Sequence, residues 1–156
     1  MNHKLVSPAL MWAIVLFGFA ASWYYAPDGM AFDTNPVFCG IFALTIGNWL
    51  FFFVNAIRVH PQAAKSAHKI NRLVTYGVYS LVRHPLYSAD VALAWGAFFF
   101  FPYWKMLFAV LWMTFVLVIW MFLEEAALVE KFGQQYIAYR KNVPMLIPKN
   151  YRSKKR

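Results

Sequence analysis

The chain has 156 residues, of which 62% are hydrophobic and only 13% are charged, and its formal net charge at pH 7 is +9. A soluble domain is usually about 45–50% apolar and about 25% charged, and a globule this small cannot bury so large an apolar surplus. This composition excludes a disordered chain, and the single cysteine, Cys39, excludes a disulfide scaffold. We therefore expect an integral membrane protein whose apolar surplus faces lipid.

Four apolar segments are candidates to cross a bilayer, which takes about 20 predominantly apolar residues. They are residues 8–25, 36–57, 86–104 and 106–123. Asp90 is the only charged residue within them, and only Lys105 separates the last two, which we expect to form an antiparallel hairpin. The sequence thus predicts an all-α integral membrane protein with about four transmembrane helices in a single domain over residues 1–156.

The first segment also resembles a cleavable signal peptide, because Lys4 precedes an apolar stretch that ends near the small residues Ala20, Ala21 and Ser22. The uncharged run is 18 residues long, however, and closes with aromatic side chains at 23–25 that suit a membrane interface. We expect an uncleaved anchor.

The positive charges are distributed unevenly along the chain. Thirteen of the 15 Lys and Arg residues lie in two pieces, 58–85 and 124–156, whereas the loop after the first segment carries Asp28 and Asp33 and no basic residue. Because basic residues mark the cytoplasmic side, both termini and both pieces are predicted to be cytoplasmic. The net charge then reflects topology and attraction to anionic lipid headgroups, so no nucleic-acid partner is expected.

The first basic piece ends in a polar and aromatic cluster at the entrance of the third segment. Pro85 is well placed as the first residue of a helix, so His84 would lie beside unpaired backbone amides that favour an anion. Tyr87 lies about one turn further on and Asp90 about three residues deeper. Taken singly, Arg83 and His84 fit basic residues that extend their polar ends to the membrane interface. Tyr87 alone fits an aromatic residue of the interfacial belt. Their convergence at one helix entrance favours a site.

The second basic piece begins with two adjacent carboxylates, Glu124 and Glu125, at the end of the fourth segment. A helix C-terminus disfavours anions, so the pair needs a cation. That cation is either a basic side chain, Arg83 or Lys131, or a positively charged ligand.

Apolar and aromatic residues recur at helical spacing after the two carboxylates, at Leu128, Phe132, Tyr136 and Tyr139. This spacing predicts a cytoplasmic amphipathic helix that lies along the membrane surface. Gly133 is the place where such a helix would break.

Two ordered motifs occupy these two pieces. The first reads Leu73-Val74-Thr75-x-Gly77-x-Tyr79-x-x-x-Arg83-His84-Pro85-x-Tyr87. The second reads Glu124-Glu125-x-x-Leu128-x-x-x-Phe132-Gly133-x-x-Tyr136-x-x-Tyr139-x-x-x-Val143-Pro144. Together they resemble the isoprenylcysteine carboxyl methyltransferase family over residues 71–148, about half of the chain. The related phospholipid N-methyltransferases share the Arg-His-Pro and Glu-Glu elements.

The resemblance implies a membrane-embedded methyltransferase that binds S-adenosylmethionine at the cytoplasmic face and uses no metal. By position, the residues expected to bind this cofactor are Asn71, Leu73, Val74, Tyr79, His84, Leu86, Tyr87, Glu124 and Glu125. Trp120 stands where the family has an arginine for the substrate carboxylate, so Trp120 is expected at the substrate site. No catalytic residue is assigned.

The chemistry of the cofactor agrees with these residue types. The carboxylates suit its ammonium or ribose hydroxyls, the entrance with Arg83 and His84 suits its carboxylate, and tyrosines suit its sulfonium through cation–π attraction. Its sulfonium is already a reactive methyl donor, so positioning and exclusion of water are the main tasks. An amine acceptor would first have to lose a proton.

The methyl acceptor is expected to be a lipophilic or lipid-linked carboxylate, thiol or amine. We expect it to enter from the bilayer through an opening lined by residues 98–101 and Trp112, with Trp120 making the acceptor pocket apolar. The helix over 128–139 would close the cytoplasmic side.

Two alternative functions stay open: the chain is a small multispan transporter, or it is a non-catalytic membrane scaffold. An acidic residue within the membrane such as Asp90 often marks an ion path. A transporter should have polar residues near mid-membrane on several helices, whereas here they gather at one rim. That distribution favours the enzyme.

Overall fold

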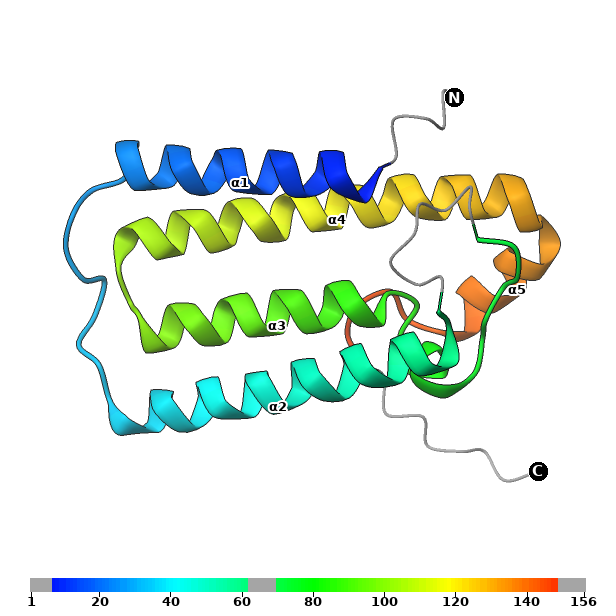
Figure 1. Ribbon diagram of the computed structural model, residues 1–156, viewed down its shortest axis with the longest axis horizontal. Helices are drawn as coiled ribbons and strands as arrows, with labels where there is room; N and C mark the ends of the chain where they lie inside the picture. The colour runs from blue at the N-terminus through cyan, green and yellow to red at the C-terminus, as the bar shows by residue number, and fades with distance from the viewer. Residues whose placement is uncertain (1–6, 62–69, 149–156) are drawn as a thin grey trace.

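Four long helices run side by side in the computed structural model, which describes residues 7–61 and 70–148 (Figure 1). They are α1 (Pro8–Tyr25), α2 (Pro36–Val59), α3 (Pro85–Phe100) and α4 (Trp104–Phe132). A 3-10 turn, η3 (Gly77–Ser80), precedes α3, and a short helix, α5 (Gln134–Asn142), follows α4. The described residues contain no β-strand, only an isolated bridge between Met30 and Tyr103. The predicted all-α class is confirmed.

Proline begins three of the four long helices. Pro8, Pro36 and Pro85 each occupy the first helical position, where the missing backbone N–H costs no hydrogen bond. Before α2, the Asn35 side chain accepts a hydrogen bond from the backbone N–H of Val37 at 2.9 Å and caps the helix. These helix starts follow from local sequence alone.

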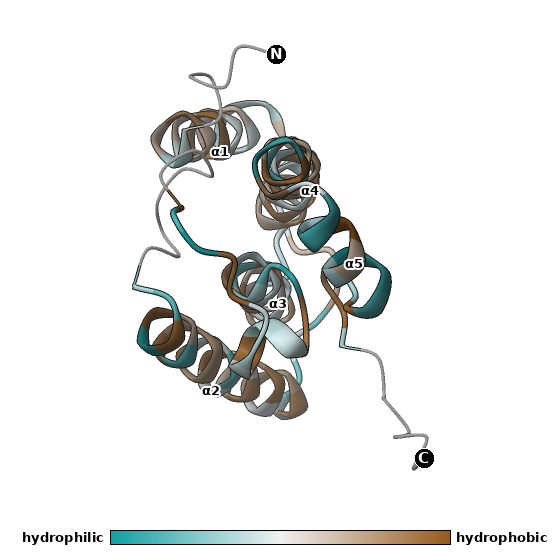
Figure 2. Cartoon of the chain, turned by 90° about the vertical axis from the view of Figure 1, so that its right-hand side faces the viewer, coloured by the Kyte–Doolittle hydropathy of each residue, from teal (hydrophilic) through white to brown (hydrophobic). Residues whose placement is uncertain are grey.

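The helices pack as two pairs, α1 on α4 and α2 on α3, and α3 joins the pairs by contacting α4 (Figures 1 and 2). Between α1 and α4, the Trp112 indole lies over Gly18 and its Nε1 donates to the Ile14 carbonyl at 2.9 Å. Between α2 and α3, Thr45 lies directly over Gly96. Small residues at these crossings allow the close approach by which helices associate in lipid.

Apolar side chains cover the outer faces of the bundle; Phe17 and Leu44, for example, are 72% and 75% exposed. By length and composition, α1, α2 and α4 can each cross a membrane. The 16 residues of α3 reach about 24 Å, less than the roughly 30 Å of a hydrocarbon core. The segment 86–104, which was expected to cross the membrane, is helical only as far as Phe100, because the chain turns there toward α4. The structure does not confirm the count of four spans, which stays a prediction.

Gly133 divides the predicted amphipathic helix over 128–139 into two parts. Its φ of 56° lies in the left-handed region, which glycine adopts without strain, so α4 ends at Phe132 and α5 begins at Gln134. The first part therefore continues α4, and only the second is a separate helix. That the segment lies along the membrane surface stays a prediction.

Gly18→Ala should destabilise the bundle, because a Cβ at Gly18 would lie 1.9 Å from Cδ1 of Trp112. Overpacking of this kind costs about 1–3 kcal/mol, which outweighs the roughly 1 kcal/mol that alanine gains over glycine within a helix. We expect a lower thermal unfolding midpoint in detergent. Gly40→Ala in α2, where a Cβ meets nothing within 4 Å, is the matched control and should not lower the midpoint. Equal midpoints for the two variants would contradict this packing.

Candidate functional site

A cavity of about 280 Å³ opens at the end of the bundle that carries α5, the end that faces the viewer in Figure 2. All four long helices, the stretch 70–74, η3 and α5 contribute to its wall. Seven of the nine residues predicted to bind the cofactor line it: Leu73, Val74, Tyr79, His84, Leu86, Tyr87 and Glu124. The two sequence motifs, which lie on either side of the α3–α4 hairpin, therefore meet in one cavity.

Arg83 holds the polar part of this wall together. Its Nε donates to Glu125 Oε1 at 2.7 Å, and its Nη1 donates to the carbonyls of Arg140 and Val143 at 2.8 and 2.9 Å. Carbonyls at the end of a helix lack helical partners and attract a cation, so the end of α5 suits a guanidinium. The cation that Glu125 requires is thus Arg83, one of the two basic partners considered from sequence.

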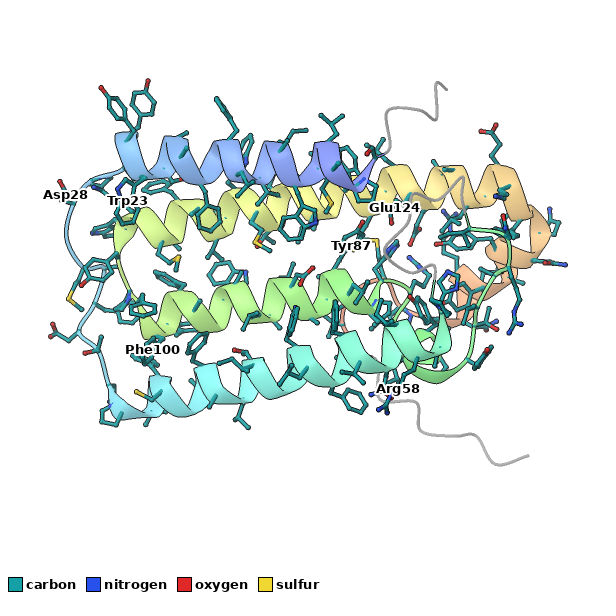
Figure 3. All side chains as sticks on the ribbon, in the orientation of Figure 1. Trp23, Asp28, Arg58, Tyr87, Phe100 and Glu124 are labelled. Carbon is teal, nitrogen blue, oxygen red and sulfur yellow. The ribbon has the colours of Figure 1, made fainter. Side chains whose placement is uncertain are left out.

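Three side chains form a contact network beside this pair. Tyr87 Oη donates to Glu124 Oε1 at 2.7 Å, and the two side chains point toward each other from α3 and α4 (Figure 3). The His84 ring stacks on Tyr87, with Nδ1 3.8 Å from Glu124 Oε2 and Nε2 3.4 Å from Glu125 Oε1. His84 is buried, and its Nε2 makes no hydrogen bond to any described residue. The His84 ring thus lies between the two carboxylates of α4.

Tyr136 of α5 also lines the cavity and carries a second polar atom without a partner. It is 1% exposed, and its hydroxyl makes no hydrogen bond within the described part of the chain. Burial, reinforced by the negative charge of Glu125, raises the pKa of Tyr136, so the hydroxyl keeps its proton at neutral pH. An unsatisfied buried polar group costs about 1–3 kcal/mol, which a ligand atom can offset. Sequence analysis placed Tyr136 on an apolar stripe and did not identify it as a site residue.

The end of α2 adds a polar wall that sequence analysis did not identify. His60 contacts Tyr79 edge-on, with ring centroids 5.8 Å apart, and both line the cavity. Burial, with a smaller effect of the Arg72 charge, lowers the pKa of His60, so its imidazole is neutral at pH 7. The hydroxyl of Tyr139 donates to the Tyr79 carbonyl at 2.6 Å and ties α5 to η3. Nothing in the local sequence around His60 indicated that it would reach this wall.

The part of the cavity that extends into the bundle is apolar except for one carboxylate. Trp12 of α1 and Trp49 and Phe53 of α2 line it, together with Asp90 of α3. Asp90 Oδ1 accepts a hydrogen bond from Trp49 Nε1 at 2.7 Å. Sequence analysis did not identify Trp49, because the segment around it is uniformly apolar and gives no signal for a site.

Three residues assigned to the site from sequence do not line the cavity. Asn71 is exposed beside it, and Glu125 is buried behind it as the partner of Arg83. Trp120 is 5% exposed and packs in the core between α1 and α4 with Met11 and other apolar residues. Because Met11 lines the cavity, Trp120 supports the wall from behind.

The expected opening past residues 98–101 and Trp112 is wrong. Phe98, Phe99 and Phe100 contact phenylalanines of α2 and of the α1–α2 loop at the opposite end of the bundle, where Figure 3 labels Phe100. Trp112 is held against α1 at Gly18, away from the cavity. These aromatic side chains pack the helices against one another. Composition alone cannot distinguish them from aromatic side chains that line a pocket.

The chain belongs to the phospholipid methyltransferase family, whose sequence model matches residues 35–135. That range contains α2, α3 and α4 and ends one residue before Tyr136. A protein-S-isoprenylcysteine O-methyltransferase of Schizosaccharomyces pombe is 40% identical over 93 residues, which cover 54% of this chain and 36% of the relative. The chain thus spans little more than a third of the relative's length. The resemblance found in the sequence motifs is confirmed.

Arg83→Lys should loosen α5, because a single ammonium cannot reproduce the bonds of the guanidinium to Glu125 and to two carbonyls. Losing one such charge-assisted bond costs about 1.5–3 kcal/mol. We expect faster amide hydrogen exchange over 134–142. Arg140→Lys, at a half-exposed side chain 3.8 Å from Glu125, is the control and should leave the exchange unchanged. Unaltered protection in Arg83→Lys would show that α5 docks by other contacts.

Proposed function

We propose that this chain is an integral membrane methyltransferase that binds S-adenosylmethionine in the cavity and methylates a small lipophilic acceptor at the cytoplasmic face. The observation that carries the proposal is the contact between the two motif halves. Tyr87 and Glu124, 37 residues apart in sequence, are hydrogen-bonded in the cavity wall beside the buried ring of His84, which lies between Glu124 and Glu125 (Figure 3). Membership of a methyltransferase family supports this reading, and the named activity of the yeast relative supports an apolar acceptor.

The polar residues of the cavity fit the cofactor group by group. Glu124 supplies negative charge for its ammonium or ribose hydroxyls, and the tyrosine rings supply faces for the sulfonium. Arg83, expected from sequence to meet the cofactor's carboxylate, is already bonded to Glu125 and to two carbonyls. Tyr136 lines the cavity, and its hydroxyl, which has no hydrogen-bond partner among the described residues, is better placed to donate to that carboxylate. When bound, S-adenosylmethionine supplies an activated methyl group on a sulfonium.

The protein's own contribution is to position the reactants and to exclude water. The segment that follows α5 runs along the start of α3, where the Arg83 and His84 amides donate to the carbonyls of Pro144 and Met145. Ser88 Oγ donates to the next carbonyl, that of Leu146, at 2.8 Å. These bonds hold the start of α3, and with it the side chains that α3 presents to the cavity, in a fixed position.

The apolar part of the cavity supports entry of the acceptor from the bilayer between α1 and α2. These two helices belong to different packed pairs, and both contribute aromatic side chains to the cavity. Trp12 and Phe53 are 39% and 41% exposed, so the cavity wall reaches the lipid-facing surface there. This route replaces the one expected from sequence past the phenylalanines at the far end.

His84→Ala and Glu124→Gln should each weaken S-adenosylmethionine binding by about 1–3 kcal/mol, the cost of losing one polar contact in a buried site. The measurement is isothermal titration of the detergent-solubilised protein. Glu130→Gln, at an exposed carboxylate on the same helix, is the matched control and should bind like the unmodified protein. Full affinity in both site variants would move the cofactor elsewhere, and absence of binding to the unmodified protein would contradict the proposed function.

Orientation is tested by labelling a single cysteine with a membrane-impermeant reagent in intact cells, in a Cys39→Ser background. We expect Asp33→Cys to be labelled from outside and Lys141→Cys only after permeabilisation, because basic residues remain cytoplasmic. Both positions are exposed in the structure. Three crossings separate them if α2, α3 and α4 all span. Labelling of both positions from the same side would mean that α3 does not cross.

A further inference from the structure

His60 is a polar side chain of the cavity wall to which neither the sequence motifs nor the proposed cofactor contacts give a role. It is 8% exposed, and within the described residues its imidazole has a ring contact with Tyr79 and no hydrogen bond. A buried polar group without a partner is costly, and in a cavity wall a ligand atom can take the place of the partner. His60 is therefore a candidate to bind part of the ligand.

The position of His60 is fixed by the elements around it. α2 ends at Val59, whose side chain lies so close to Gly77 that a Cβ there would be 2.9 Å from Val59 Cγ2. Gly77 also has a φ of 65°, so only glycine lets η3 pack this tightly against α2. η3 thereby places Tyr79 beside His60, and the Tyr139 hydroxyl donates to the Tyr79 carbonyl from α5. The imidazole thus belongs to a wall that three helical elements hold in place.

The charges around the cavity decide which part of the cofactor suits this wall. Burial and the nearby charge of Arg72, which also lines the cavity, lower the pKa of His60 and keep its imidazole neutral at pH 7. A guanidinium at this wall disfavours the sulfonium and the ammonium, for which Glu124 supplies negative charge. The cofactor's carboxylate has the Tyr136 hydroxyl, so the uncharged adenine is the polar group that remains.

The neighbouring side chains suit a flat, uncharged ring. Ile70 and Leu73 supply apolar surface and Tyr79 supplies an aromatic ring, and all three line the cavity. The 6-amino group of adenine is a hydrogen-bond donor and needs an acceptor. Arg72 can only donate, whereas a neutral imidazole offers one acceptor nitrogen. His60 therefore supplies what the 6-amino group requires.

We propose that His60 is a specificity-determining residue whose imidazole accepts a hydrogen bond from the 6-amino group of the cofactor's adenine. This inference rests on the proposed function and assigns a part of the cofactor that the proposed contacts leave open. His60 takes no part in methyl transfer, and its role is to select the ligand by its base.

The test compares S-adenosylhomocysteine with the analogue that lacks only the 6-amino group, by isothermal titration of the detergent-solubilised protein. The unmodified protein should bind the analogue about 3- to 10-fold more weakly, as expected for loss of one hydrogen bond. In His60→Ala, S-adenosylhomocysteine should bind more weakly than to the unmodified protein, and the two ligands should bind equally. A general structural defect would weaken both ligands by the same factor and would leave their ratio unchanged.

Three further comparisons make the result specific. His60→Gln keeps a side-chain acceptor and should retain part of the preference for the amino group. Arg58→Gln, at an exposed residue in the last turn of α2, is the matched control and should keep the full preference. The 7-deaza analogue keeps the 6-amino group and loses a ring nitrogen, so its affinity relative to S-adenosylhomocysteine should be the same in the unmodified protein and in His60→Ala.

Two results overturn the inference. The first is equal affinity of the unmodified protein for S-adenosylhomocysteine and the analogue without the amino group, which requires no variant to fold. The second is an undiminished preference in His60→Ala with an unchanged thermal midpoint. The proposed function stands in both cases, because the protein binds the adenosyl ligand. Failure of the unmodified protein to bind either ligand overturns the proposed function itself.

Discussion

The guanidinium of Arg83 is the group on which the arrangement of the site depends. It bonds Glu125 of α4 and two carbonyls at the end of α5 from a position one residue ahead of the helix cap His84. A buried ion pair is favourable only when its remaining donors are satisfied, and the carbonyls of α5 do this for Arg83. The relative positions of α3, α4 and α5 are thereby fixed, and with them the contact of Tyr87 with Glu124.

One stripe of α3 connects the two parts of the cavity. His84, Tyr87 and Asp90 follow one another at intervals of three residues, so their side chains lie along one face of α3, beginning at its N-cap. Under the proposed function, the first two contact the cofactor. The stripe belongs to a helix rather than to a loop, so the groups that it presents to the cavity are held in a fixed geometry.

Composition and local pattern were sufficient for the membrane class, the all-α fold and the starts of α1, α2 and α3. The motifs also identified most of the residues that line the cavity, because both motifs flank the α3–α4 hairpin and a hairpin returns its two ends to the same place. Properties of this kind depend on short stretches of chain. Apolar content, helix-initiating prolines and motif spacing are all legible in the sequence without knowledge of which helices touch.

Only the tertiary structure decided which of the two adjacent glutamates faces the cavity. Glu124 and Glu125 are neighbours in sequence, but successive side chains on a helix point about 100° apart, so one lines the cavity and the other meets Arg83. The hydrogen bond between Trp49 and Asp90 joins residues 41 positions apart on different helices. Such contacts depend on how helices rotate and cross when they pack, and a local pattern of apolar residues is compatible with many such packings.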